Sequence, residues 1–157
     1  MDAFDDMMLK RMADAIEVAW RRGSYAGFVG AQPERDIELL EATLGYRLPR
    51  DYRLFLRHFG TGSVRGCEIC GLFSNCAATR MWPSTYSALD MTREDGQPAD
   101  RLIISTDGAD GRYCIMTTEL DDKQCAPVVW CTFYPPHEIE ERWATFVDFF
   151  VDMASNP

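Results

Sequence analysis

Three cysteines near the middle of the chain have the spacing that most suggests chemistry. Cys67 and Cys70 form a C-x-x-C pair, and Cys76 follows closely. Zinc binds tetrahedral sets of thiolates, and a redox pair needs adjacent sulfurs. The apolar run around the pair predicts a strand over residues 67–73, in which residues three apart point to opposite faces. Because no second C-x-x-C is present, the pattern favours buried thiols, and we expect neither a metal nor a cofactor.

Two glycine-rich segments have the composition of ligand-binding loops but not their spacing. Gly60, Gly62 and Gly66 form G-x-G-x-x-x-G after a predicted helix, whereas a dinucleotide-binding loop has G-x-G-x-x-G between a strand and a helix. Segment 107–111, DGADG, lacks the ligand series and final glutamate of a calcium-binding EF-hand loop. The first segment therefore indicates the end of a helix, and the second indicates a tight hairpin.

The histidines do not complete a catalytic set. The chain has only His58 and His137, and neither lies in a local signature of a serine or cysteine hydrolase. We expect both on the surface or at the flank of a helix. An enzyme that uses Cys67 or Cys70 is therefore the least favoured functional alternative.

Acidic residues outnumber basic residues by 25 to 16, which gives the chain a formal charge of −9. This balance argues against nucleic acid or an anionic membrane as the direct partner, and it suits a basic protein that exposed carboxylates would attract. A solvated surface that only keeps the protein soluble is the alternative. The candidate partner-binding residues are acidic and lie in the C-terminal half: Asp107, Asp110, Glu119, Asp121, Asp122, Glu138, Glu140 and Glu141.

The chain before the cysteines predicts two consecutive helices. Ile37, Leu40 and Leu44 recur at helical spacing, and a glycine follows them where a left-handed cap would end the helix. A proline then precedes a second helix over Arg50–Phe59, with Phe55 on its apolar face. The sequence therefore places a short helix pair directly before the cysteine-containing strand.

A basic stripe lies on the opposite side of the second helix. Arg50, Arg53 and Arg57 recur there at intervals of three and four residues. Such a stripe is typical of a solvated helix face, and a patch for an anionic ligand is the second interpretation.

The helix pair carries a family pattern. Its residues read I-x-x-L-E-x-x-L-G-x-x-L-P-x-D-Y-R-x-F-L-x-x-F-G-x-G, followed by E-I-x-G-L. This pattern resembles the SUKH superfamily of cell-wall regulator and bacterial immunity proteins, over roughly residues 37–151. The resemblance implies a single α+β domain with N-terminal helices, a mainly antiparallel central sheet and a closing helix. It also implies a non-catalytic protein-binding function.

The remaining segments fit that architecture. Apolar runs predict strands near residues 102–105, 112–117 and 127–133, and short connections favour antiparallel neighbours. An apolar stripe predicts a last helix over His137–Met153, and another predicts a first helix over Phe4–Trp20 with a methionine-rich face that we assign to the core. Residues 23–32 are expected to form a loop, and residues 74–100 to be mostly irregular with one helical turn near 84–89.

The length of 157 residues suits one domain. We expect residues 1–32 to form an N-terminal helix and loop, and residues 33–153 to form the family-like core. The acidic N-terminus is unlike a signal peptide, and no apolar run approaches the roughly 18 residues of a membrane span. The sequence therefore predicts a cytoplasmic protein with reduced thiols.

The resemblance and the charge together predict an immunity protein that neutralises a cognate basic toxin, such as a nuclease, by direct binding. An intracellular scaffold or regulator that binds a cellular protein is the alternative.

Overall fold

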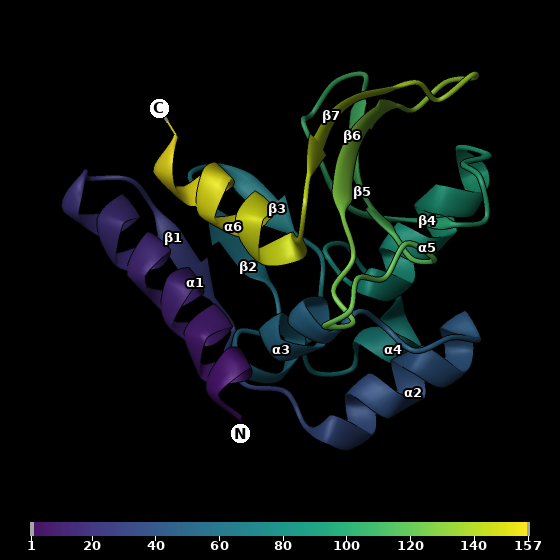
Figure 1. Cartoon of the computed structure of the whole chain (residues 1–157). Helices are drawn as coiled ribbons and strands as arrows, with labels where there is room; N and C mark the ends of the chain where they lie inside the picture. The colour runs from purple at the N-terminus through teal and green to yellow at the C-terminus, as the bar shows by residue number, and fades with distance from the viewer. Residues whose placement is uncertain (1, 157) are drawn as a thin grey trace.

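The computed structural model describes residues 2–156 and has a mixed α+β architecture, with helices at both ends of the chain (Figure 1). This confirms the predicted fold class. In chain order the elements are α1 (Ala3–Arg21), β1 (Ala26–Phe28), α2 (Glu34–Leu44), α3 (Arg50–His58), β2 (Gly62–Val64), β3 (Cys67–Ile69), α4 (Cys76–Thr79), α5 (Thr85–Glu94), β4 (Arg101–Thr106), β5 (Gly111–Met116), β6 (Val128–Thr132), β7 (Ile139–Trp143) and α6 (Phe146–Ser155).

The helix pair forms where the sequence predicts it. Gly45 has a left-handed backbone with φ of +85°, and its N–H donates to the carbonyl of Glu41, which closes α2. Pro49 precedes α3, because its fixed φ suits a helix start. Helix α3 ends at His58, and Gly60 follows with φ of +74°. The turn at Gly60 directs the chain into β2.

The strands form two antiparallel sheets. One has the order β1-β2-β3, and the other has the order β4-β5-β6-β7. They meet just after β3, where the N–H of Cys70 donates to the carbonyl of Ile104 in β4, at 2.8 Å. The four-stranded sheet is an antiparallel meander, as the short connections predict, and its successive turns therefore alternate between its two ends.

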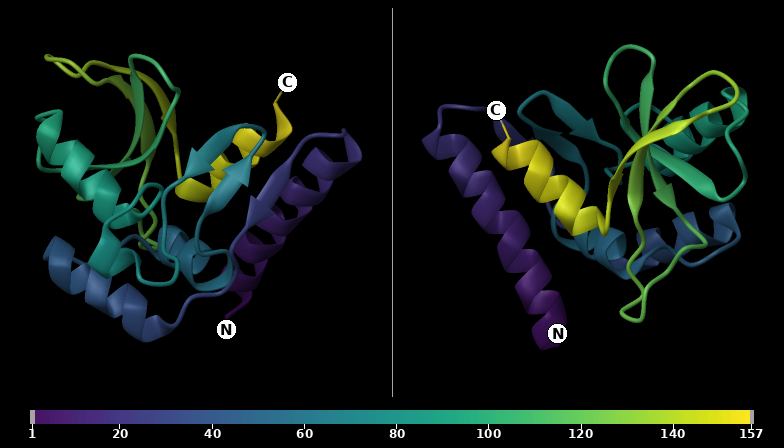
Figure 2. Two further views of the ribbon diagram at one scale, coloured as in Figure 1. Left: turned by 180° about the vertical axis from the view of Figure 1, so that it is seen from behind. Right: turned by 45° about the horizontal axis from the view of Figure 1, so that its top comes forward.

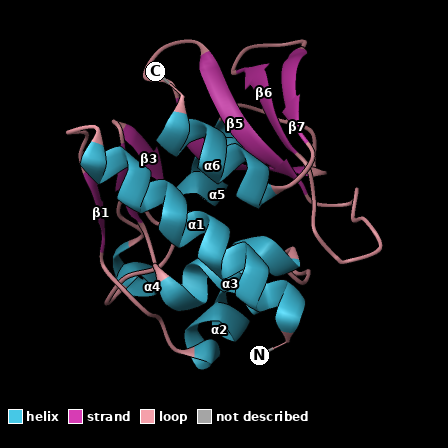
Figure 3. Ribbon diagram, turned by 60° about the vertical axis from the view of Figure 1, so that its left-hand side comes forward, coloured by secondary structure: helices cyan, strands magenta, loops and turns pink. Residues whose placement is uncertain are grey.

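The main core lies between the three-stranded sheet and the helices α1, α3 and α6 (Figure 3). Phe55 of α3 is fully buried, and its ring centroid lies 5.9 Å from that of Phe28 and 6.0 Å from that of Phe150. Helices α1 and α6 pack side by side (Figure 2). Met8 and Met12 of α1 are buried in this core, which confirms the core assignment of the methionine stripe.

The four-stranded sheet is covered on both faces. On one face, the ring of Tyr113 lies 5.2 Å from that of Phe149 in α6. On the other face, α5 packs on β4, and Met91 contacts a smaller cluster that includes Ile103, Cys114 and Cys131. No helix within residues 2–156 combines the length and apolarity that crossing a bilayer would need.

The predicted last helix is wrong over its first part, because residues 139–143 form strand β7. Ile139 pairs with Cys131, and Trp143 pairs with Val128. Residues four apart lie on one face of a helix and also on one face of a strand, so the spacing of Ile139 and Trp143 fits both structures. Helix α6 begins only after Thr145, whose side chain accepts a hydrogen bond from the N–H of Asp148.

Four further segments differ from the prediction: three are more ordered than expected, and one strand is shorter. Strand β1 lies in the expected loop 23–32, and β2 lies in the expected turn after Gly60. The expected strand 67–73 is reduced to the three residues of β3. Segment 74–100 contains α4 and the ten-residue α5, whose buried face includes Thr85, Ala88 and Thr92. Small and hydroxyl-bearing residues on that face weaken the hydrophobic period by which a helix is detected.

Candidate functional site

The eight predicted partner-binding carboxylates are all exposed, but they do not form one surface. The β4–β5 and β6–β7 turns lie at the same end of the four-stranded sheet, because Gly111 pairs with Thr132 and Cys131 pairs with Ile139 (Figure 1). Five of the eight gather there, and we name this group the acidic hairpin end: Asp107, Asp110, Glu138, Glu140 and Glu141. The other three, Glu119, Asp121 and Asp122, follow β5 at the opposite end.

Most of the acidic hairpin end is electrostatically uncompensated. Within residues 2–156, Asp110, Glu138, Glu140 and Glu141 form no ion pair. The nearby cation Arg112 is paired with Asp95, at 2.8 Å between Nε and Oδ2. This end of the sheet therefore carries concentrated negative charge that faces solvent.

Asp107 differs because its carboxylate organises the β4–β5 turn. Its Oδ1 accepts hydrogen bonds from the N–H groups of Ala109 and Gly111, at 2.9 and 3.0 Å, and its Oδ2 accepts from Trp130 Nε1 at 3.1 Å. Burial raises the pKa of this carboxyl, but the donors outweigh it and the net pKa is lowered. Asp107 therefore stays ionised and holds the turn in shape.

The opposite acidic group is largely structural. Glu119 forms an ion pair with Arg142. Asp121 accepts hydrogen bonds from the N–H groups of Lys123 and Cys125, at 2.8 and 3.0 Å. Within the described residues Asp122 forms no ion pair and accepts no hydrogen bond from the chain, in contrast to the other two. Since two of these three carboxylates are already engaged, this group is the weaker candidate for binding a partner.

The arginines of α3 do not form a solvated face, so that prediction is wrong. Arg53 is buried, and its guanidinium contacts Glu41 at 3.0 Å and Glu34 at 2.6 Å. Arg57 shares Glu34, at 2.8 Å, and Arg50 pairs with Asp5 of α1, also at 2.8 Å. Helices α1 and α2 supply these carboxylates, which helical spacing within α3 cannot reveal. All three guanidiniums form ion pairs with carboxylates of the same chain, which disfavours a patch that binds an anionic ligand.

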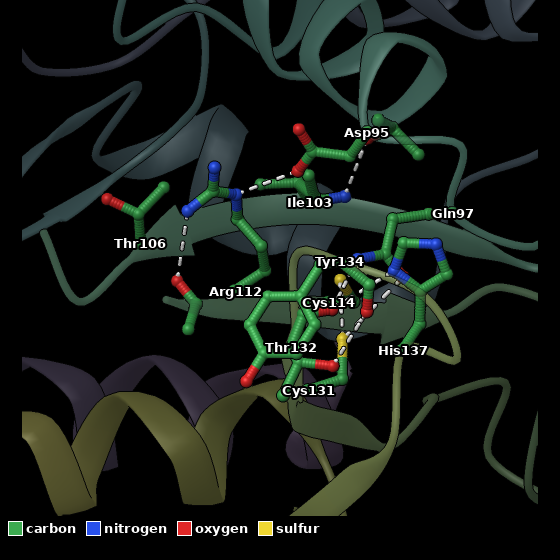
Figure 4. Close-up of polar contacts among 12 residues, drawn as sticks. Asp95, Gln97, Ile103, Thr106, Arg112, Cys114, Cys131, Thr132, Tyr134 and His137 are labelled. Carbon is green, nitrogen blue, oxygen red and sulfur yellow. Dashed lines mark hydrogen bonds and ion pairs between the residues drawn. The ribbon is translucent and has the colours of Figure 1, made fainter. Parts of the chain in front are cut away.

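The prediction that both histidines lie on the surface or at a helix flank is wrong for His137, which is buried. Its Nδ1 lies 3.1 Å from the carbonyl oxygen of Thr132, and Gln97 Nε2 donates to the same oxygen at 3.1 Å (Figure 4). The carbonyl of His137 in turn accepts from Arg101 Nη1, at 2.7 Å. These contacts fix the β6–β7 turn that carries Glu138 and leads into β7, where Glu140 lies.

Two buried thiols lie beside this network. The Sγ atoms of Cys114 and Cys131 are 3.7 Å apart on neighbouring strands (Figure 4). Their hydrogen bond lowers the pKa of Cys131 and raises that of Cys114, and the guanidinium of Arg101 further favours the Cys131 thiolate.

In the described residues, no three histidine, cysteine or acidic side chains are arranged to hold a metal ion. The two cysteines of the C-x-x-C pair have different environments. Cys67 Sγ contacts Ser105 Oγ at 3.4 Å, whereas Cys70 is fully buried.

An apolar groove on the outer face of the three-stranded sheet was not predicted. Its volume is about 770 Å³, and Tyr25, Val29 and Met81, all more than half exposed, line it together with Trp82. Sequence signals for this groove are weak, because its strands have three residues each and lie in segments with the composition of loops.

Comparison with models of known protein families gives a match over most of the chain. The family model described as SMI1 / KNR4 family (SUKH-1) matches residues 33–152, from the residue before α2 to most of α6. None of the curated proteins matches the chain significantly. The matched region contains α2, α3 and both sheets except β1, so the motif of the helix pair and the strands that follow it fall within one family pattern. The chain therefore belongs to the SMI1/KNR4 family (SUKH-1).

Proposed function

We propose that this protein is an immunity protein of the cytoplasm, which binds a basic protein toxin directly and blocks its active or substrate-binding surface without turnover of its own. Membership of the family supports a non-catalytic immunity or regulatory protein that acts by binding another protein. The observation that carries the finer proposal is the acidic hairpin end, where four exposed carboxylates have no ion pair within the described residues.

The proposed mechanism is electrostatic attraction followed by occlusion. A toxin that acts on nucleic acid needs Lys and Arg side chains near the phosphates of its substrate. The acidic hairpin end offers that surface a competing set of anions on a rigid sheet end. Charges of this kind act mainly on the rate of encounter, so higher salt should slow association more than it speeds dissociation.

Growth rescue tests the proposal. The protein is co-expressed with each toxin candidate encoded beside its gene, and we expect one candidate to be neutralised. The variant Glu140→Lys/Glu141→Lys should lose protection while its thermal unfolding stays unchanged. The matched control, Glu38→Lys/Glu94→Lys, changes the net charge equally at exposed helical positions and should protect fully.

A second charge reversal separates binding from stability. Asp121→Lys removes the acceptor of two N–H groups and should cost about 1–3 kcal/mol of stability, with little direct effect on toxin binding. If no neighbouring toxin is neutralised and no basic protein co-purifies, the immunity proposal fails in favour of the scaffold or regulatory alternative.

A further inference from the structure

The outer face of the three-stranded sheet has an unusual combination of a small-residue floor and large apolar walls. Gly27, Ser63 and Glu68 are register partners across β1, β2 and β3 and form one row. Phe28, Val64 and Ile69 belong to the opposite, core-facing side. In this row Gly27 has no side chain and Ser63 has a small one, while Glu68 stands on the edge strand. The phenol of Tyr25 lies over Gly27, in the space that a Cβ there would occupy, so Tyr25 and Ser63 form the floor at this point.

The walls of the groove are exposed and apolar. Tyr25 and Val29 flank β1 with 70% and 59% of their surface exposed, and Met81 from the segment before α5 is 61% exposed. Trp82 and Phe73 complete the lining and are partly buried. Exposed large apolar residues are ordinary when scattered, but their convergence on one concave surface marks an interaction site.

Glu68 determines the charge of this groove. It is the only charged residue among those that line it, and within residues 2–156 it forms no ion pair. Beyond Glu68 lies a second hollow of about 480 Å³, which shares Gly66, Glu68 and Trp82 with the groove and reaches Asp107 of the acidic hairpin end. Arg65 also borders this second hollow. The apolar and acidic surfaces are therefore continuous.

We propose that this groove is the primary contact for the protein partner, and that it accepts an aromatic or long aliphatic side chain flanked by a Lys or Arg that reaches Glu68. The inference rests on the proposed function, because it takes the partner to be a basic protein. The acidic hairpin end then acts as the rim that attracts the partner, while the groove supplies the buried apolar contact that slows dissociation. One wall, from β1, lies outside the region that the family model matches.

Titration with short peptides tests the groove without the toxin. The probe is the blocked tripeptide Lys-Trp-Lys, added to ¹⁵N-labelled full-length protein and followed by NMR. We expect saturable shifts of the Gly27, Ser63 and Gly66 amides and of the Trp82 indole. Glu-Trp-Glu should bind more weakly, and Lys-Ala-Lys should produce no saturable shift at these positions.

Variants locate the binding energy. Ser63→Leu fills the groove and should abolish the saturable shifts, and Met81→Ser, which removes an exposed wall, should weaken binding about threefold or more. Glu68→Gln should weaken Lys-Trp-Lys about fivefold, the upper range for an exposed ion pair, and leave Ser-Trp-Ser unaffected. Ala13→Leu on α1 and Glu38→Gln on α2 change exposed residues outside the groove and should bind as the wild type does.

Three results would overturn the proposal. The first is a set of peptide-induced shifts that map outside the groove and persist in both Ser63→Leu and Met81→Ser. The second is an affinity for Glu-Trp-Glu equal to that for Lys-Trp-Lys. The third is movement of the groove resonances on dilution of the protein alone, which would identify a second copy of the chain as the occupant. The growth assay separates this proposal from the proposed function. Full protection by both Ser63→Leu and Met81→Ser would refute the groove and leave the immunity function standing, whereas peptide binding without any neutralised toxin would do the reverse.

Discussion

A single buried carboxyl should make the stability of this protein depend on pH in an unusual direction. Asp51 lies in the first turn of α3 and is fully buried without a cationic partner in the described residues. Its Oδ2 accepts a hydrogen bond from the N–H of Val147 in the first turn of α6, at 3.3 Å, and its Oδ1 accepts from the N–H of Tyr52 at 3.1 Å. Burial outweighs these donors and raises the pKa of Asp51 to about 7.

The magnitude follows from the difference between the folded and unfolded pKa. The ordinary value is 3.8, so between about pH 4 and pH 7 the unfolded chain releases a proton that the folded protein keeps. Stability from this group is fully present below the unfolded pKa and is lost as the pH rises through the folded one. At about 1.36 kcal/mol per unit, the loss totals about 4 kcal/mol, of which about 2.5–3 kcal/mol falls between pH 5 and pH 8.

Comparison with Asp51→Asn isolates this contribution. The asparagine keeps an oxygen for the N–H of Val147 but cannot ionise, so any fixed cost of the substitution is the same at every pH. Urea unfolding of both proteins at several values between about pH 5 and pH 8 gives the difference in unfolding free energy. We expect it to shift in favour of the variant by about 2.5–3 kcal/mol as the pH rises. Parallel pH profiles would refute the reasoning, and a shift toward the wild type would mean that the end of α6 stabilises the carboxylate more than burial penalises it.

Three further predictions concern the packing, the buried ion pairs and the thiols. Phe55→Ala should lower the unfolding free energy by about 3–5 kcal/mol, because it empties a fully buried aromatic site. The exposed control Leu39→Ala should change the unfolding free energy by no more than about 0.5 kcal/mol. Equal melting temperatures for the two variants would contradict the assigned core. Arg53→Met should lower the unfolding free energy by about 3–5 kcal/mol, because it leaves Glu41 without its buried partner. Arg57→Met breaks a more exposed ion pair and should lower it by at most about 1 kcal/mol. Chemical denaturation measures both changes. Treatment with a chelator and a thiol reductant should leave the melting temperature unchanged, and stoichiometric zinc that is lost together with the fold in Cys67→Ser would overturn that expectation.

Local sequence signals determined the elements whose stability is mostly local. Pro49 and Gly45 set helix boundaries through their own backbone preferences, and the apolar spacing of α1 and α3 specifies which face each helix buries. The runs that became β4, β5 and β6 are long and apolar enough to be recognised alone. These elements, in their order, were sufficient to indicate the family and the fold class.

Tertiary structure decided everything that depends on pairing between distant segments. Strands β1, β2 and β3 exist because their backbone groups bond to one another, and three residues carry too little pattern to predict that. Residues 139–143 form a strand because their backbone groups pair with the otherwise unpaired edge of β6. The arginines of α3 are neutralised by α1 and α2, and five of eight acidic residues share one surface only because two turns lie at one end of an antiparallel sheet. Charge and residue type are properties of the sequence, but which charges remain unpaired, and which apolar residues converge on one groove, is fixed only when the chain brings distant residues together.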